Sequence, residues 1–341
     1  MSAPRGEAAA GLDPGYVELL GRYARGERPE AIAALGRWSE HALQKQLAAI
    51  EDARVDTERC TTYPNPLAHL PLRAAAMLHT DRDEVERPEP SGREQIPQCP
   101  GPHARIAGRY AALLARDPET RDFARRLFLA RAQQWQLKAC FEDALRGARD
   151  GLALFPRDAE LLLTAGSVLE ERAVLATSSG GEAARLRRDW LNQARRELTD
   201  AVTSDPDLAL ARVRLGRVLW RLGQPEAARA ALEAALPHAR EAKDGYLAHL
   251  FLGRIQEDAK RLDQALAEYR QAVDVHPEAQ SAAIALSHAL QLTGEPEASR
   301  QALTRGLGNP LSARDAYWDY LVSNARRTDE LLDTLHREAL E

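Results

Sequence analysis

The second half of the chain repeats a fixed pattern of small and large residues. In the clearest copy, the pattern runs from Gly253 through Ala265, Tyr269 and Ala272 to Pro277. Small residues at such positions let two helix backbones approach closely, and proline ends a helix because it has no amide donor. The pattern therefore predicts a series of paired antiparallel helices, with the large residue in the space between neighbouring pairs.

Other copies of the pattern keep the same order along the chain. The equivalent positions hold Gly216, Ala228, Leu232 and Ala235; Gly166, Ala194, Leu198, Ala201 and Pro206; Ser287, Ser299, Leu303 and Gly306; and Ala144, Ala148, Gly151 and Pro156. This pattern resembles the tetratricopeptide repeat family, whose unit is a helical hairpin. The resemblance covers residues 125–313. It implies an all-α, right-handed superhelical solenoid of about five hairpins, because no hairpin buries its apolar face alone.

Composition agrees with a helical protein and narrows the function classes. Hydrophobic residues make up 44% of the chain but aromatic residues only 5%, so the core is built mostly from alanine and leucine. The net charge of −5 provides no basic field for nucleic acid. No apolar stretch is typical of a signal peptide or a membrane span, so we expect a cytoplasmic protein with no nucleic-acid or membrane partner. Cys60, Cys99 and Cys140 are too widely spaced to indicate a disulfide framework.

The pattern divides the chain into five regions. We expect a disordered N-terminus (1–12), an N-terminal helical region (13–79), a proline-rich charged linker or loop (80–103), the solenoid (104–313) and C-terminal capping helices (314–341). The interval from Gly166 to Ala194 is much longer than the equivalent interval from Gly216 to Ala228, so one hairpin carries an insert at 173–188. We predict that this insert lengthens both helices by about two turns, or about 12 Å.

The resemblance also implies where a partner would bind. In this family the first helix of each hairpin, the A helix, lines a concave groove through its second, fifth, ninth, twelfth and thirteenth positions. Carried onto this sequence, the partner-binding groove comprises Arg217, Trp220, Arg221, Leu250, Arg254, Ile284 and His288. Arginines beside a tryptophan suit a carboxylate and a flat apolar anchor. In the alternative, the arginines form solvated ion pairs with Glu160, Glu170, Glu171, Glu257 or Asp258.

Sequence motifs for chemistry are sparse. Cys99 and His103 lie close together, but no second pair at metal-ligand spacing accompanies them. The chain has no glycine-rich phosphate loop and no nucleophile elbow, so we expect no enzyme, no cofactor and no metal. The main hypothesis is a scaffold that binds another protein or a peptide, possibly an acidic one. The alternatives are a self-associating structural protein, a homo-oligomer, and an enzyme or metal-binding module in the N-terminal region.

Overall fold

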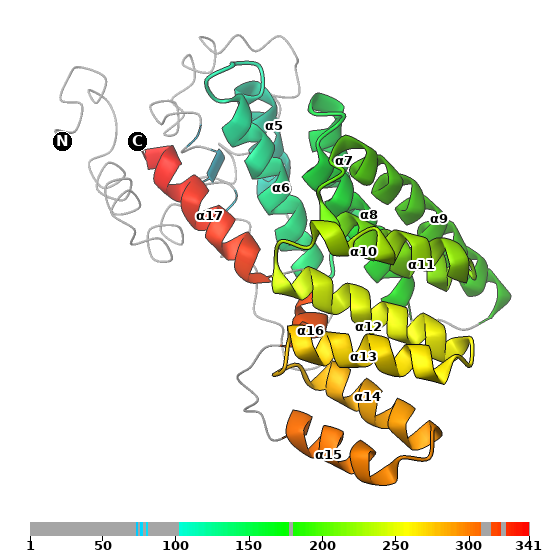
Figure 1. The fold of residues 1–341 in the computed structure, drawn as a ribbon. Coiled ribbons are helices and arrows are strands. Elements are labelled where there is room, and N and C mark those ends of the chain that lie inside the picture. The colour runs from blue at the N-terminus through cyan, green and yellow to red at the C-terminus, as the bar shows by residue number, and fades with distance from the viewer. Residues whose placement is uncertain are drawn as a thin grey trace, which may run out of the picture. The chain divides into compact units, whose positions relative to one another are not determined.

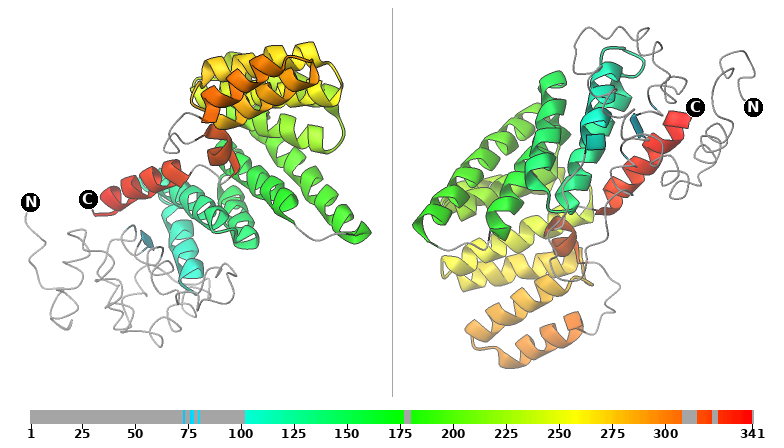
Figure 2. Two further views of the ribbon diagram at one scale, coloured as in Figure 1. Left: turned by 90° about the horizontal axis from the view of Figure 1, so that it is seen from below. Right: turned by 180° about the vertical axis from the view of Figure 1, so that it is seen from behind.

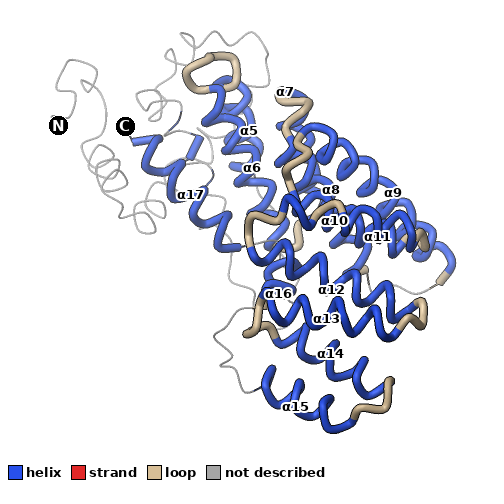
Figure 3. Tube along the Cα trace, in the orientation of Figure 1, coloured by secondary structure: helices blue, strands red, loops and turns tan. Residues whose placement is uncertain are grey.

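The structure is a computed structural model that describes residues 73, 76, 77, 80, 102–176, 180–307, 315–321 and 325–340. The expectations for residues 1–12 and for most of 13–79 and 80–103 therefore lie outside the described residues. The chain divides into two compact units, Met1–Asp143 with Arg327–Glu341 and Ala144–Arg326. Every regular element in the described part of the chain is helical (Figures 1 and 3).

The described helices of the first unit are α5 (Pro102–Leu114), α6 (Arg121–Leu137) and most of α17 (Ala325–Leu340). A bidentate ion pair joins α6 to α17. Arg126 donates through Nη1 and Nη2 to the two carboxylate oxygens of Glu338, at 2.7 and 2.6 Å. Thr328 adds a hydrogen bond to Gln133 at 3.2 Å. A planar guanidinium matched to both oxygens of one carboxylate fixes orientation as well as distance.

The second unit holds most of α7 and then four consecutive hairpins. In chain order its elements are α7 (Phe141–Leu154), α8 (Ala159–Leu175), α9 (Gly181–Ser204), α10 (Ala209–Arg221), α11 (Pro225–Glu233), the 3-10 turn η2 (Leu236–His238), α12 (Ala242–Asp258), α13 (Leu262–Val275), α14 (Gln280–Leu292), α15 (Pro296–Leu307) and α16 (Ala316–Leu321). Each A helix (α8, α10, α12 or α14) packs against the B helix that follows it, and each B helix packs against the next A helix (Figures 1 and 2). This is the all-α hairpin solenoid that the repeat predicts.

Four turns between A and B helices share one backbone geometry. The fifteenth residue of these copies has a left-handed φ: 56° at Ala139, 77° at Gly223, 62° at Lys260 and 81° at Gly294. The copy with the insert differs, because its fifteenth residue, Ala173, lies within α8. In each of the four turns the next amide donates to the carbonyl five residues earlier, at 2.9 or 3.0 Å. This is the Schellman arrangement that ends a helix and satisfies its last carbonyls. The repeat therefore recurs in backbone conformation as well as in side-chain size.

The glycine of each repeat lies directly against the large residue of its own B helix. A Cβ atom at Gly216 would lie 2.5 Å from the Leu232 side chain, and one at Gly253 would lie 2.4 Å from the Tyr269 ring. Both distances are shorter than a real carbon–carbon contact. The large residues thus fill the gap within their own hairpin, whereas the sequence pattern suggests the space between neighbouring hairpins.

The last hairpin has polar residues at both small positions of the repeat. Ser287 stands in the glycine position and Ser299 in the alanine position, and both are buried. Their hydroxyls lie 2.9 Å apart, and the Ser299 hydroxyl also donates to the Ser287 carbonyl at 2.9 Å. Small side chains at both positions are thus retained, and each buried hydroxyl has a partner, as burial of polar atoms requires.

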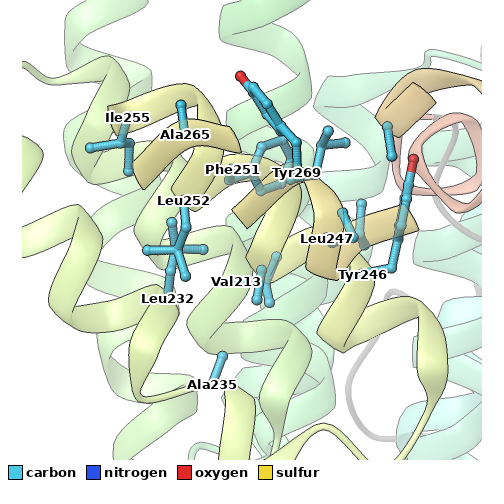
Figure 4. Close-up of a cluster of buried hydrophobic side chains, with 14 of the residues drawn as sticks. Val213, Leu232, Ala235, Tyr246, Leu247, Phe251, Leu252, Ile255, Ala265 and Tyr269 are labelled. Atoms are coloured by element: carbon cyan, nitrogen blue, oxygen red, sulfur yellow. The ribbon is translucent and has the colours of Figure 1, made fainter. Parts of the chain in front are cut away.

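One continuous core joins the last three hairpins. It contains buried side chains from α10 to α14 and from α16, and partly buried alanines of α15 pack against it. The close-up labels ten of its residues: Val213, Leu232, Ala235, Tyr246, Leu247, Phe251, Leu252, Ile255, Ala265 and Tyr269 (Figure 4). Helix α12 contributes more of these residues than any other helix because it packs against helices on several sides. An apolar surface that no single hairpin could bury is therefore shared between neighbours.

The insert at residues 173–188 lengthens its two helices unequally. From Gly166, α8 continues for nine residues to Leu175, whereas α10 continues for five residues from Gly216 to Arg221. Helix α9 has 24 residues where α13 has 14. The extension is thus about one turn in α8 and about three in α9, rather than two turns in each. The tip, residues 177–179, lies outside the described residues.

Candidate peptide-binding face

The A helices α8, α10, α12 and α14 carry polar and aromatic groups that contact α16 or Asp315, the residue before it. Helix α16 is a six-residue helix from near the end of the chain (Figure 1). We call this surface of the four helices the A-helix face. It comprises the residues next to α16 and Asp315 and the more exposed residues along the same helices: Glu170, Glu171, Arg214, Arg217, Tyr246, Phe251, Ser281, Trp220, Arg254, Glu257, Asp258 and His288. The sequence predicts capping helices over 314–341. Helix α16 lies on α12, within this face.

A buried charge cluster forms the centre of the A-helix face. The carboxylate of Glu170 is fully buried and accepts hydrogen bonds from Arg214 and Arg217, each at 2.9 Å. It also accepts the Tyr320 hydroxyl at 2.7 Å. Arg214 Nη2 donates to the Tyr320 carbonyl at 3.0 Å and lies 3.5 Å from Glu171. Two arginines and two glutamates thus balance each other in a site closed to water, where an unpaired charge would be costly.

Aromatic rings surround this cluster. The Arg214 guanidinium lies 4.2 Å from the centre of the Tyr320 ring, and Arg217 lies 4.9 Å from the same ring. Phe251 of α12 meets the edges of Tyr320 and Tyr317, with ring centres 5.4 and 6.1 Å apart. Burial, and then the charge of the nearby carboxylate Glu170, raise the pKa of the Tyr320 hydroxyl. The hydroxyl therefore stays protonated and acts as a donor.

A second contact holds the start of α16. The Asp315 carboxylate accepts the Tyr246 hydroxyl at 2.8 Å and the Ser281 amide at 2.6 Å. It also accepts the Tyr317 amide at 2.9 Å, as the N-cap residue of a helix does. Burial, and then the charge of Asp315, raise the pKa of the Tyr246 hydroxyl, which keeps it a donor. The buried carboxylate is therefore satisfied by three donors from three elements.

A more exposed row of residues continues along the A-helix face. The Trp220 indole nitrogen donates to Asp258 at 3.0 Å. Arg254 lies 3.6 Å from Glu257 and 3.7 Å from Asp258, and the His288 ring lies 3.2 Å from Glu257. Arg254 and His288 are both about half exposed, so these pairs contribute little to stability. Their charged groups remain accessible to solvent.

A pocket of about 390 Å³ opens beside this row, between α8, α9 and α10. Its lining consists of Ala173, Val174, Ala184, Arg187, Arg188, Leu191, Trp220, Arg221 and Leu222. These described residues include three arginines and no carboxylate. Burial, and then the neighbouring charge of Arg217, lower the pKa of the Arg221 guanidinium. The pocket is therefore an apolar recess with a positive rim.

The insert provides one wall of this pocket. Arg187 and Arg188 belong to the N-terminal extension of α9, and Ala173 and Val174 to the C-terminal end of α8. Within the described part of the chain, neither Arg188 nor Arg221 forms an ion pair. A regular hairpin without the extra turns would leave this end of α10 without a neighbour on that side.

A family model described as a tetratricopeptide repeat matches the chain in three overlapping windows, residues 181–246, 213–283 and 250–316. Residues 181–316 of this chain are tetratricopeptide repeats. The windows span helices α9 to α15, and the repeat frame predicted from the sequence coincides with these helices. Repeats of this kind indicate a scaffold for protein–protein interaction.

Among solved structures, this tetratricopeptide repeat protein is similar to residues 41 to the end of MamA from Desulfovibrio magneticus RS-1, with 20% identity, 56% of this chain and 97% of that chain covered, and a TM-score of 0.42. It is also similar to PilF of Pseudomonas aeruginosa (17% identity, 63% and 90% covered, TM-score 0.47). A third is YrrB, described as a TPR protein with an unusual peptide-binding site (16% identity, 64% of this chain and 99% of that chain covered, TM-score 0.39). Likenesses of this size carry no information about a ligand. No curated protein matches the sequence.

None of the described helices combines the length and apolar character needed to cross a membrane. The same residues contain no cluster of three or more histidine, cysteine or acidic side chains that could hold a metal ion. Cys99 lies outside the described residues, as does the side chain of His103.

The structure distributes the site residues expected from the tetratricopeptide frame over three environments. Arg217 and Leu250 are buried, with 2% and 8% of their surface exposed. Ile284, Arg254 and His288 are about half exposed. Trp220 and Arg221 line the pocket. The frame therefore places these residues on the A helices as expected, but the chain's own α16 covers the part that contains Arg217.

The arginines of this tetratricopeptide repeat protein also differ in their ion pairs. Arg254 pairs with Glu257 and Asp258 at the surface, as the alternative interpretation suggests. Arg217 pairs with Glu170, which that interpretation also names, but the pair is buried rather than solvated. Arg221 forms no ion pair with a glutamate or an aspartate among the described residues. The three arginines are thus not equivalent, although the sequence frame treats them alike.

The sequence pattern does not identify several residues of the A-helix face and of the pocket. Arg214 and Phe251 occupy the sixth position of their repeats, outside the five groove positions that the family implies. Asp315 and Tyr320 lie in a segment that the sequence indicates only as a cap. Arg187 and its neighbour Arg188 form a basic run in the insert, but nothing in the sequence places that run beside Trp220.

Proposed function

We propose that this protein is a scaffold that binds an acidic peptide segment of a partner along the A-helix face, with a carboxylate of that segment in the pocket beside Trp220. The pocket carries the proposal: it brings three arginines, an indole and an aliphatic floor together without a carboxylate among its described lining residues. Guanidinium groups recognise carboxylates in a planar, often bidentate geometry. An indole beside them supplies an apolar anchor of the kind that dominates many interfaces.

The electrostatics of Arg221 support an anionic ligand. Its lowered pKa means that burial and the charge of Arg217 disfavour the charged form in the free protein. A carboxylate at this position would offset both effects, because opposite charges at close range stabilise each other. The exposed row that contains Arg254 and His288 offers further donors along the same face. We therefore expect binding to weaken as the salt concentration rises.

The test uses a library of random dodecapeptides displayed with free C-termini. Selection on the wild-type chain should enrich aspartate and glutamate, and selection on an Arg188→Glu/Arg221→Glu variant should not. The tightest enriched peptide, labelled with a fluorophore, should lose about 10-fold or more in affinity for that variant, since a charge-assisted hydrogen bond contributes about 1.5–3 kcal/mol.

The matched control is Arg270→Glu/Arg305→Glu, which makes the same charge change at two exposed arginines on the B helices α13 and α15. It should leave both the enrichment and the affinity close to the wild-type values. A library that shows no preference for acidic residues, or an equal loss of affinity in the control, would contradict the proposal. Circular dichroism of all variants verifies that the helices are intact.

A further inference from the structure

The segment from Asp315 to Tyr320 is held at two points in the way that a bound peptide is held. At one end, a carboxylate accepts hydrogen bonds from Tyr246 and the Ser281 amide. At the other end, a tyrosine donates its hydroxyl to Glu170 and accepts Arg214 at its carbonyl. All these partners belong to the A helices α8, α10, α12 and α14.

The charges of the A-helix face balance without this segment. Glu170 would keep Arg214 and Arg217 as partners if α16 left, and Arg214 would also keep Glu171. The groups that lose a partner are the Glu170 carboxylate, which loses the Tyr320 hydroxyl, the Tyr246 hydroxyl, the Ser281 amide and one nitrogen of Arg214, all of which water can satisfy. Departure of α16 would therefore leave no isolated charge in an apolar environment. The face is thus complete as a receptor, and the segment is exchangeable.

We infer that the A-helix face recognises a partner segment that carries an aspartate and, five residues later, a tyrosine, and that residues 315–320 are an internal ligand that such a segment replaces. This inference rests on the proposed function, in which the same face binds a peptide. The aspartate would meet Tyr246 and Ser281. The tyrosine hydroxyl would meet Glu170, and its ring would contact the Arg214 guanidinium and meet the Phe251 ring edge-on, as the Tyr320 ring does.

An internal ligand competes through its effective concentration. A segment that belongs to the same chain is present at roughly millimolar effective concentration near its site. If the free peptide binds the open face with a Kd of about 10 μM, the tethered segment would weaken its apparent affinity about 100-fold. A partner must therefore bind the open face more tightly than the internal segment, or contact the neighbouring pocket as well.

The experiment measures the binding of a fluorescein-labelled peptide with the sequence of residues 313–322 to the full chain. The receptor variant Asp315→Ala/Tyr320→Ala weakens the internal ligand and leaves every residue of the A helices unchanged. It should bind the peptide at least 10-fold more tightly than the wild-type chain does. Peptides that carry Asp315→Asn or Tyr320→Phe should each bind this variant several-fold more weakly than the unchanged peptide.

Unchanged affinity in a folded double variant would overturn the inference, because α16 would then be a fixed part of the fold. If the double variant fails to fold, the full chain with Tyr320→Phe decides instead. This change keeps the ring and removes only the hydroxyl donor to Glu170, and it should raise peptide affinity by about two- to fivefold. No increase in that variant would also overturn the inference. If the wild-type chain dimerises by exchanging α16, the segment that binds the A-helix face belongs to a second copy of this chain, and the inference of a different partner protein is wrong. Sedimentation of the wild-type chain detects such a dimer.

The outcome separates this inference from the proposed function. Acidic enrichment in the library without binding of the 313–322 peptide would reject the internal ligand and retain the acidic-peptide scaffold. Binding of the 313–322 peptide without acidic enrichment would reject the role of the basic pocket and retain the recognition of the aspartate and tyrosine.

Discussion

Among single residues, the repeat depends on the fit between one small and one large side chain in each hairpin. The pairs differ in chemistry, with leucine over Gly216 and a tyrosine ring over Gly253. The last hairpin uses two hydrogen-bonded serines in the two small positions. What recurs is therefore the space available between the helices rather than the identity of the residues. Lys260 shows the same tolerance, because it adopts the left-handed turn conformation that Gly223 and Gly294 adopt.

Substitution of the repeat glycine tests this fit. Gly253→Ala would place a carbon 2.4 Å from the Tyr269 ring and should reduce the free energy of unfolding by about 1–3 kcal/mol through overpacking. Gly245→Ala in the same helix is the matched control, since the closest atom to its new carbon would be 3.7 Å away. The control should be neutral or raise stability by up to about 1 kcal/mol, because alanine favours helix.

Urea unfolding followed by circular dichroism measures both variants. Equal stability of the two alanine variants would show that the Tyr269 ring moves aside without loss, and the steric account of the repeat would be wrong.

Among the helices, the insert creates the feature that distinguishes one hairpin from the others. The extra turns of α8 and α9 leave the Gly166 contact with Leu198 intact, because they lie beyond the point where the two helices meet most closely. They add the basic wall of the pocket instead. The hairpin thus keeps its place in the stack while one end acquires a different surface.

Removal of residues 173–188 should therefore separate stability from binding. The shortened hairpin regains the regular spacing between its small positions, the spacing of Gly216 and Ala228, so we expect a helical protein that still unfolds cooperatively. Affinity for the selected acidic peptide should fall about 10-fold or more, because Arg187 and Arg188 are lost. Circular dichroism and fluorescence anisotropy measure the two properties. Unchanged peptide affinity in a folded variant would exclude the pocket wall from binding.

Across the whole molecule, two compact units divide the chain, and each is held by contacts between residues far apart in the sequence. In the second unit, Glu170 and Tyr320 meet although 150 residues separate them. In the first unit, Arg126 and Glu338 meet across 212 residues. Such contacts close long loops, so each unit requires its C-terminal segment to be in place before its polar groups are satisfied.

Acid should weaken the first unit through Glu338. The hydrogen bond from Arg126 and then its charge, acting against burial, lower the pKa of this carboxyl below its ordinary value of 4.5. A lowered folded-state pKa stabilises the fold above the ordinary value and loses this effect as the pH falls through the folded-state value. Both side chains are partly exposed, so we expect a contribution of about 1 kcal/mol or less.

Hydrogen exchange read by mass spectrometry tests this assignment. At neutral pH, Glu338→Gln should increase exchange in α6 and α17 and leave residues 180–307 unchanged, and the difference from the wild type should shrink as the pH falls below 4.5. A difference that persists in acid would mean that the carboxylate charge is not what holds α17.

The repeat frame, the all-helical fold and the A-helix positions of the expected site residues can all be read from the sequence. Each of these follows from interactions inside one hairpin, where a glycine, an alanine and a large residue lie close together along the chain and recur. The sequence also locates the insert, although not how unequally its turns are shared between α8 and α9.

Only the tertiary structure determines which groups lie together on the A-helix face. The pairing of Arg217 with Glu170, the covering of both by Tyr320, and the meeting of Arg187 with Trp220 all join different hairpins or distant segments. No local pattern encodes such contacts, because side chains from four elements must arrive at one place before any of them has its partner. A buried charge is stable only when its partners are already there, and that condition is met by the packed helices rather than by any one segment.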